Sequence, residues 1–147
     1  MNFIDILNRY AASPPGRGNP QDAEDHFYQV VNNAPPEMVS EGLADTFRAD
    51  ETPPFADMVA QLFEHSNPHQ RAGLLRHLRD GSEVSDDEAD AFEPRQVKDI
   101  ARRAEEHNPS VIERVSQFYA RHPDLVRNLG SMALSVAMRN MARRARH

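Results

Sequence analysis

The chain of 147 residues contains no cysteine and no tryptophan. Without cysteine there is no disulfide scaffold, no thiolate zinc site, no iron–sulfur cluster and no cysteine nucleophile. Because disulfides mark oxidising compartments, their absence predicts a cytoplasmic location. The length fits one compact domain, or two small lobes that share a core, rather than a large multidomain enzyme.

Long hydrophobic runs are also missing. The longest largely apolar stretch, residues 129–138, includes a glycine and two serines and has about half of the ~20 residues that a membrane-spanning helix needs. Near the N-terminus, Asp5 interrupts the apolar residues, which is unlike a secretory signal. We therefore expect a soluble protein that is at most peripheral to a membrane.

Charge is distributed unevenly along the chain. Residues 1–93 carry 6 Lys/Arg and 18 Asp/Glu, a net charge of -12, whereas residues 94–147 carry 11 and 5, a net charge of +6. These two values account for the overall charge of -6. An acidic half makes nucleic acid an unfavourable partner, although the opposite charges favour contacts within one molecule or between copies.

Prolines divide the sequence into helical segments. Apolar residues between them recur at helical spacing, as in Phe55, Met58, Val59, Leu62 and Phe63. Proline is tolerated at the first position of a helix, where its missing N–H costs nothing. The predicted first residues are Pro20, Pro35, Pro53, Pro68, Pro94, Pro109 and Pro123.

This pattern predicts helices at residues 2–12, 20–33, 35–49, 53–66, 68–79, 94–107, 109–121 and 123–145. No segment alternates with the period of two that a strand requires. The predicted fold is therefore an all-α, compact, irregular or orthogonal bundle of seven to nine short helices without a sheet.

Two segments read as loops, residues 13–19 and residues 80–93. The second is acidic and divides the chain into an acidic helical lobe, residues 1–79, and a basic helical lobe, residues 94–147, which are expected to share one core. Ser85 and Glu88 have the spacing of a capping box, so a short helix at 86–92 with Phe92 facing inward is possible within this linker.

The predicted core consists of apolar residues at helical spacing. They are Phe3, Ile6, Leu7, Phe27, Val30, Val31, Leu43, Phe47, Phe55, Val59, Leu62, Phe63, Leu75, Leu78, Ile100, Val111, Val115, Phe118, Leu129 and Val136.

No motif predicts catalysis, a cofactor or a metal. His65 and His69 are four residues apart, but Pro68 starts a new helix between them and should separate the two rings. His65 and His107 instead suit the C-terminal ends of helices, where the dipole favours a cation. The carboxylates of residues 86–90 lack the glycine of a calcium loop, and Gly16 and Gly18 lack the preceding strand of a phosphate-binding loop.

The C-terminal helix offers the one candidate binding surface. Its first half is apolar around much of its circumference, which is typical of a buried helix, and its second half becomes basic. Adaptable methionine side chains beside arginines can also fit a partner's groove. The candidate partner-binding residues are Met132, Met138, Met141, Arg139, Arg143, Arg144 and Arg146.

Segments 52–63, 67–75, 108–115 and 118–126, with their Asn-Pro and Thr-Pro-Pro helix starts, resemble a group of small, uncharacterised, all-helical bacterial proteins. These are more distantly similar to the YidB-like family. The resemblance covers nearly the whole chain and implies an all-α bacterial protein. It provides no catalytic residues to carry over, and the acidic linker stands where such proteins have a stretch rich in Gly, Ala and Leu.

Taken together, the sequence predicts a non-enzymatic helical interaction or scaffolding module that self-associates or docks a protein through its C-terminal helix. One alternative is a peripheral binder of anionic membrane surfaces that uses the same helix. A second is a small metal-dependent or acid–base enzyme whose site is assembled across helices. No small-molecule substrate is identified.

Overall fold

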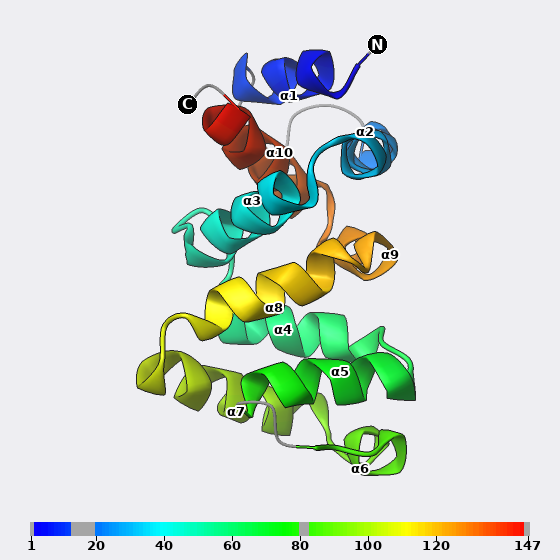
Figure 1. The fold of residues 1–147 in the computed structure, drawn as a ribbon, viewed down its shortest axis with the longest axis vertical. Helices are drawn as coiled ribbons and strands as arrows, with labels where there is room; N and C mark the ends of the chain where they lie inside the picture. Colours follow the sequence, from blue (N-terminus) through cyan, green and yellow to red (C-terminus); the bar gives the residue numbers. More distant parts are fainter. Residues whose placement is uncertain (1, 13–19, 80–82, 146–147) are drawn as a thin grey trace.

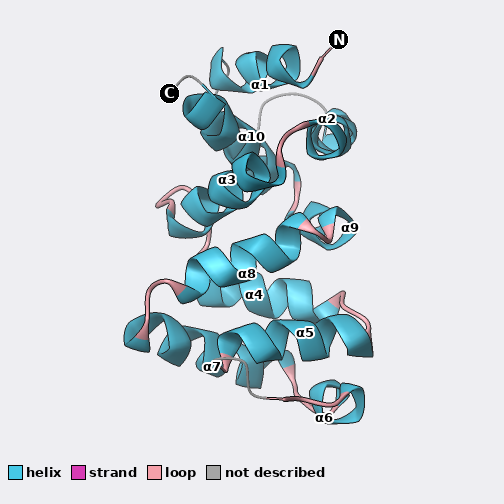
Figure 2. Ribbon diagram, in the orientation of Figure 1, coloured by secondary structure: helices cyan, strands magenta, loops and turns pink. Residues whose placement is uncertain are grey.

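The computed structural model describes residues 2–12, 20–79 and 83–145. Helices dominate these residues, and no strand occurs among them, so the predicted all-α class is confirmed (Figure 2). The predicted loop 13–19 and the first three residues of the predicted linker lie outside the described residues.

The described residues form ten α-helices and one 3₁₀ turn, which follow one another with short connections. In chain order they are α1 (Phe3–Ala12), α2 (Pro20–Asn33), α3 (Pro36–Arg48), α4 (Phe55–Glu64), α5 (Pro68–Leu78), α6 (Asp86–Asp90), α7 (Pro94–His107), α8 (Val111–Ala120), α9 (Pro123–Val126), η1 (Arg127–Leu129) and α10 (Ser131–Ala145).

Four of the seven predicted prolines occupy the first position of a helix: those that begin α2, α5, α7 and α9. Pro35 and Pro53 are each followed by a second proline, and α3 and α4 begin later than predicted. A residue before proline is disfavoured in the helical region, which keeps Pro35 extended at φ -58 and ψ 140. Pro109 lies in the turn before α8, where the Asn108 side chain accepts hydrogen bonds from the Ser110 amide and hydroxyl.

The prediction of one continuous helix over residues 123–145 is wrong, because the helix is interrupted at Gly130. This glycine adopts a φ of 94°, in the left-handed region that residues with a side chain rarely enter. The chain therefore forms α9 and the 3₁₀ turn η1 before Gly130, and α10 begins afterwards at Ser131. The break gives α10 a direction that does not depend on α9.

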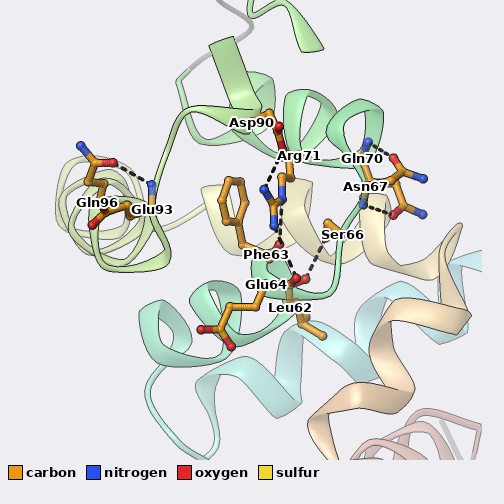
Figure 3. Close-up of polar contacts among 10 residues, drawn as sticks. All are labelled: Leu62, Phe63, Glu64, Ser66, Asn67, Gln70, Arg71, Asp90, Glu93 and Gln96. Atoms are coloured by element: carbon orange, nitrogen blue, oxygen red, sulfur yellow. Dashed lines mark hydrogen bonds and ion pairs between the residues drawn. The ribbon is translucent and has the colours of Figure 1, made fainter. Parts of the chain in front are cut away.

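Side-chain caps fix the starts of the helices at the α5–α7 end of the molecule (Figure 3). The Asn67 side chain accepts from the Gln70 amide at 2.8 Å, and Gln70 returns the bond by accepting from the Asn67 amide at 2.9 Å. Ser85 caps α6 by accepting from the Glu88 amide at 3.1 Å. The acidic segment thus contains a capped helical turn, as its spacing indicated.

The helices are stacked along the long axis of the molecule (Figure 1). At one end, α10 packs against α1, α2 and α3. At the other end, α4 packs on α7 and α5 packs on α6, while α8 lies between the ends and contacts both α3 and α5 (Figure 1). The last helix therefore joins the N-terminal helices, and the spatial grouping does not follow the division of the sequence at residues 80–93.

A single hydrophobic cluster runs through both ends of the described structure. Most of the predicted core residues are buried in it, but Phe3, Val31, Ile100 and Leu129 are only partly buried at its edge. Phe92 also packs against the cluster from the segment after α6. The cluster further includes Tyr119, Met138 and Met141, each with no exposed surface.

Candidate functional site

The methionines of α10 lie in two different environments. Met138 and Met141 are fully buried among α10, α3 and their neighbours, whereas Met132 is 51% exposed. Side chains that the chain itself covers are not available to another molecule. This placement corrects the expectation that Met138 and Met141 lie on a docking surface.

Two of the basic residues of α10 are paired within the chain. Arg139 makes a two-pronged ion pair with Glu51, in which Nη1 donates to Oε2 at 2.8 Å and Nη2 donates to Oε1. Arg144 donates through Nε and Nη2 to Asp45 at 2.8 and 2.9 Å, and through Nη1 to Glu41 at 3.2 Å. These contacts satisfy, inside one molecule, the attraction between the acidic and basic halves.

The ion pair with Arg139 also affects the acidity of its partner. The hydrogen bond from Arg139 and, to a smaller extent, the charges of Arg139 and Arg143 lower the pKa of Glu51, against a smaller opposing effect of burial. Arg143 itself is exposed, and Arg146 lies outside the described residues. Of the seven predicted partner-binding residues, only Met132 and Arg143 thus remain on the described surface without an ion pair or a buried position.

A buried polar contact reinforces the packing of α10 on α3. Asn140 is 4% exposed and donates from Nδ2 to Thr46 Oγ1 at 3.1 Å. Thr46 in turn donates to the Gly42 carbonyl at 2.7 Å, and Thr52 donates to the Thr46 carbonyl at 2.6 Å. Because buried polar groups are costly unless they are hydrogen-bonded, this network favours one alignment of the two helices.

Arg71 positions α5 and α6 relative to α4 (Figure 3). Its guanidinium lies 4.6 Å from the centroid of the Phe63 ring, and Nε donates to the Phe63 carbonyl at 3.1 Å. The same group donates to the Glu64 carbonyl at 3.4 Å and to Asp90 of α6 at 2.9 Å. Arg71, a residue of α5, thereby caps the C-terminal end of α4 and connects it to α6.

A cationic groove of about 620 Å³ lies between α5 and α8. We call it the α5–α8 groove. Among the described residues, three arginines and three histidines surround one aromatic ring, and none of the described lining residues is a carboxylate. The lining residues are His69, Gln70, Gly73, Arg76, His77, Arg114, Phe118, Arg121 and His122.

The two walls of the groove have the same helical spacing. On α5, position 69 is followed by positions 73, 76 and 77, and on α8 and the turn after it, position 114 is followed by 118, 121 and 122. Residues at i, i+4, i+7 and i+8 lie on one face of a helix. Each wall therefore places arginine or histidine at both ends and a residue without charge, Gly73 or Phe118, in the middle.

Gly73 allows the two walls to approach at the centre of the groove. A Cβ atom at this position would lie 2.9 Å from Cε2 of Phe118. The Phe118 ring also contacts both neighbouring histidines, with ring centroids 5.6 Å from His77 and 4.6 Å from His122. We call these three contacting rings the floor of the groove.

The groove favours the neutral form of His77 and His122, because their pKa values are lowered. Burial, and then the charges of Arg114, Arg121 and Arg76, lower the pKa of His77. Burial also lowers the pKa of His122, as do Arg121 and His69, while Asp124 opposes this shift. At neutral pH the positive charge of the groove therefore resides on its arginines, and the two half-buried imidazoles remain available as hydrogen-bond donors.

Sequence reasoning missed this groove, although a signal was present. The sequence analysis rejects His65 and His69 as a metal pair, assigns His65 and His107 to helix ends and places the basic surface on the C-terminal helix. The repeated spacing of basic residues at 69, 76 and 77 and at 114, 121 and 122 would have identified two basic helix faces. That the two faces meet follows from the packing of α5 on α8.

The remaining predicted features lie apart from the groove. His65 is the C-cap of α4 and His107 is the last residue of α7, which confirms their predicted places. Within the described residues, no three His, Asp or Glu side chains are grouped closely enough to hold a metal ion. The glycines at 16 and 18 lie outside the described residues.

A second, smaller hollow of about 320 Å³ borders the groove and shares Arg114 with it. Its lining includes Leu78 and Ile100 together with the basic residues Arg103 and His107.

In the described part of the chain, no helix has the length and apolar character needed to cross a membrane.

Comparisons with protein-family models, with curated proteins and with solved structures found no match to this chain. The resemblance to YidB-like proteins therefore stays a prediction.

Proposed function

We propose that this protein is a non-enzymatic helical interaction module that recognises an anionic group of its partner in the α5–α8 groove. The observation that carries this proposal is that Arg76, Arg114 and Arg121 line one hollow in which no described lining residue is a carboxylate. Such a hollow attracts anions and discriminates against cations.

The geometry of the groove supports binding rather than an incidental cluster of charges. Its volume of about 620 Å³ falls within the range typical of ligand pockets. Arginine presents its donors in a planar fork that pairs with oxyanions through two parallel hydrogen bonds. Two helices that are far apart in the sequence contribute these donors, and the Gly73–Phe118 contact holds the helices together.

The side chains of the groove also support a non-enzymatic role. A histidine that acts as a general base in nucleophilic catalysis needs a hydroxyl, thiol or carboxylate partner within reach. The described lining residues include none of these groups, because those other than arginine and histidine are glutamine, glycine and phenylalanine. We accordingly propose that the ligand is bound without being transformed and that no cofactor takes part.

The proposal keeps the predicted class of function and changes the surface that performs it. Most of the candidate residues of the C-terminal helix are buried in the core or form ion pairs within the chain. A cytoplasmic location and self-association remain proposals, the first from the absence of cysteine. Docking of an acidic segment from a second copy in the groove would be one form of self-association.

A thermal-shift experiment tests anion binding at this site. The unfolding temperature of the parent protein is measured with increasing sulfate, citrate or inorganic phosphate, with sodium chloride added to keep the ionic strength constant. A ligand at ten times its Kd stabilises the folded state by about 1.4 kcal/mol, which raises the Tm by about 3–6 °C. We expect this rise in the parent protein and its loss in the Arg76→Gln/Arg121→Gln variant.

The matched control removes two arginines from α7. Arg95 and Arg102 are exposed, pair with their near neighbours Glu93 and Asp99, and lie outside the groove. The Arg95→Gln/Arg102→Gln variant should keep the anion-dependent rise in Tm. Equal loss of the rise in both double variants, or no rise in the parent protein, would reject the groove as the binding site.

A further inference from the structure

We infer that the group bound in the α5–α8 groove is a phosphate monoester. This inference rests on the proposed function and specifies the chemistry of its ligand. The observation behind it is the arrangement of donors: exposed Arg76 and Arg121 lie on opposite walls, and half-buried His77 and His122 lie beside the Phe118 ring between them.

Donors that lie on two walls and beside the ring between them suit a tetrahedral acceptor. A phosphate monoester has three terminal oxygens that point in different directions, each able to accept more than one hydrogen bond. A carboxylate has two oxygens in one plane and is satisfied by a single arginine fork. The second wall of arginine and the imidazoles of the floor would then contribute little to its binding.

The charge of the groove points the same way. A phosphate monoester carries a charge of about -1.5 to -2 near neutral pH, and the groove presents the exposed guanidinium groups of Arg76 and Arg121. Two acidic residues of the described chain stand beside the lining residues: Asp86 lies 3.6 Å from His69, and Asp124 follows His122 by two residues. These carboxylates favour an anion that enters at the centre over one that spreads beyond the rim.

The histidines should report on the bound group directly. Arginine charges and burial hold the pKa of both His77 and His122 below the usual value. An anion that neutralises the arginines raises both pKa values, so binding is accompanied by proton uptake. Among the described residues, the other titratable groups that act on these imidazoles are Asp124, His69 and the arginines of the groove, and Asp86 of α6 lies beside His69.

NMR titration of the histidine ring resonances tests the inference at constant ionic strength and pH 7. The probes are inorganic phosphate, adenosine monophosphate, a phosphoserine peptide and its serine counterpart, and glutarate as a dicarboxylate of comparable charge. We expect the phosphate probes to shift the His77 and His122 resonances at concentrations about tenfold lower than glutarate, because phosphate uses both walls. His26 of α2, at the other end of the molecule, provides a resonance that should not move (Figure 1).

The probes separate the sources of the phosphate group. Tighter binding of the nucleotide would identify a small molecule, and tighter binding of the phosphoserine peptide over its serine counterpart would identify a modified protein. Both results support the inference when the Arg76→Gln/Arg121→Gln variant abolishes the shifts and the Arg95→Gln/Arg102→Gln variant keeps them.

Two results would overturn the inference in different ways. If glutarate shifts both histidines at the same concentration as phosphate, the groove binds anions without preferring phosphate, and the proposed function survives alone. If no probe shifts His77 or His122 while the protein remains folded, both the inference and the proposed function fail.

Discussion

Gly42 of α3 faces Met141 of α10 so closely that a Cβ atom at position 42 would lie 2.5 Å from the Met141 Cγ atom. The same Cβ would lie 3.4 Å from the Ala137 carbonyl oxygen. The absence of a side chain at position 42 thus sets the distance between the two helices that close the N-terminal end of the molecule.

Gly42→Ala should therefore destabilise the protein, although alanine is the better helix former. Overpacking of a filled core typically costs about 1–3 kcal/mol, and here the obstructing atom lies in the middle of a buried side chain. Urea denaturation measures the loss. In a Met141→Ala background, which has room for the added methyl group, Gly42→Ala should cost less, and an equal cost in both backgrounds would contradict the proposed clash.

Tyr119→Phe is expected to be neutral or stabilising. Tyr119 is fully buried, and its hydroxyl has no hydrogen-bond partner among the described residues. Removing an unsatisfied buried hydroxyl avoids a desolvation penalty of about 1–3 kcal/mol. The free energy of unfolding at pH 7 checks this, and a loss of more than about 1 kcal/mol would indicate that the hydroxyl has a partner.

The same tyrosine should affect stability in alkali. Burial raises the pKa of Tyr119 far above its ordinary value of 10.0. Above pH 10 the unfolded chain loses this proton while the folded chain keeps it, so stability falls as the pH rises. The Tyr119→Phe variant should lose less stability than the parent protein between pH 9 and pH 11, measured by urea denaturation.

Acid should weaken the protein through the groove histidines. The pKa values of His77 and His122 are lowered in the folded state from the ordinary value of 6.5. As the pH falls below 6.5, the unfolded chain takes up protons before the folded chain does, and stability therefore decreases. His77→Gln/His122→Gln should reduce the slope of stability between pH 7 and pH 5. From pH 7.5 to pH 9, where these histidines are neutral in both states, the variant and the parent should show parallel curves.

The Arg139–Glu51 pair should contribute more than the exposed ion pairs of α7. The Arg139 side chain is 13% exposed and holds Glu51 through both carboxylate oxygens, whereas the Arg95 side chain is 85% exposed. We expect Arg139→Gln to lower the free energy of unfolding by about 1 kcal/mol, at the upper end of the range for partly exposed pairs. Arg95→Gln should leave the free energy of unfolding almost unchanged.

The pH dependence of stability provides a second test of the Arg139–Glu51 ion pair. The pKa of Glu51 is lowered from 4.5 by Arg139, so its stabilising effect is present above that value and is lost as the pH falls through the folded-state pKa. Arg139→Gln should therefore reduce the decrease in the free energy of unfolding that occurs as the pH falls below 4.5, which we call the acid limb. Identical acid limbs in urea experiments on both proteins would contradict a role for the pair.

The sequence itself determined where helices form, because the signals are local. The reciprocal bonds of Asn67 and Gln70 span three residues, and the apolar stripe from Phe55 to Phe63 lies on one face of any helix that forms there. Gly130 was also readable in principle, since glycine supplies the positive φ that interrupts 123–145. Doubled prolines delayed α3 and α4 by an equally local effect.

Tertiary structure alone decided which faces are covered and which remain open. Helical periodicity shows which residues share a face but not what covers that face, so the sequence alone is compatible with Met138 and Met141 in a core or on a docking surface. The packing of α10 against α3 buries both residues. The α5–α8 groove likewise depends on two basic faces that meet from separate parts of the chain, with Gly73 against Phe118. Such meetings depend on packing angles and close approaches between distant segments, which no local pattern of residues encodes.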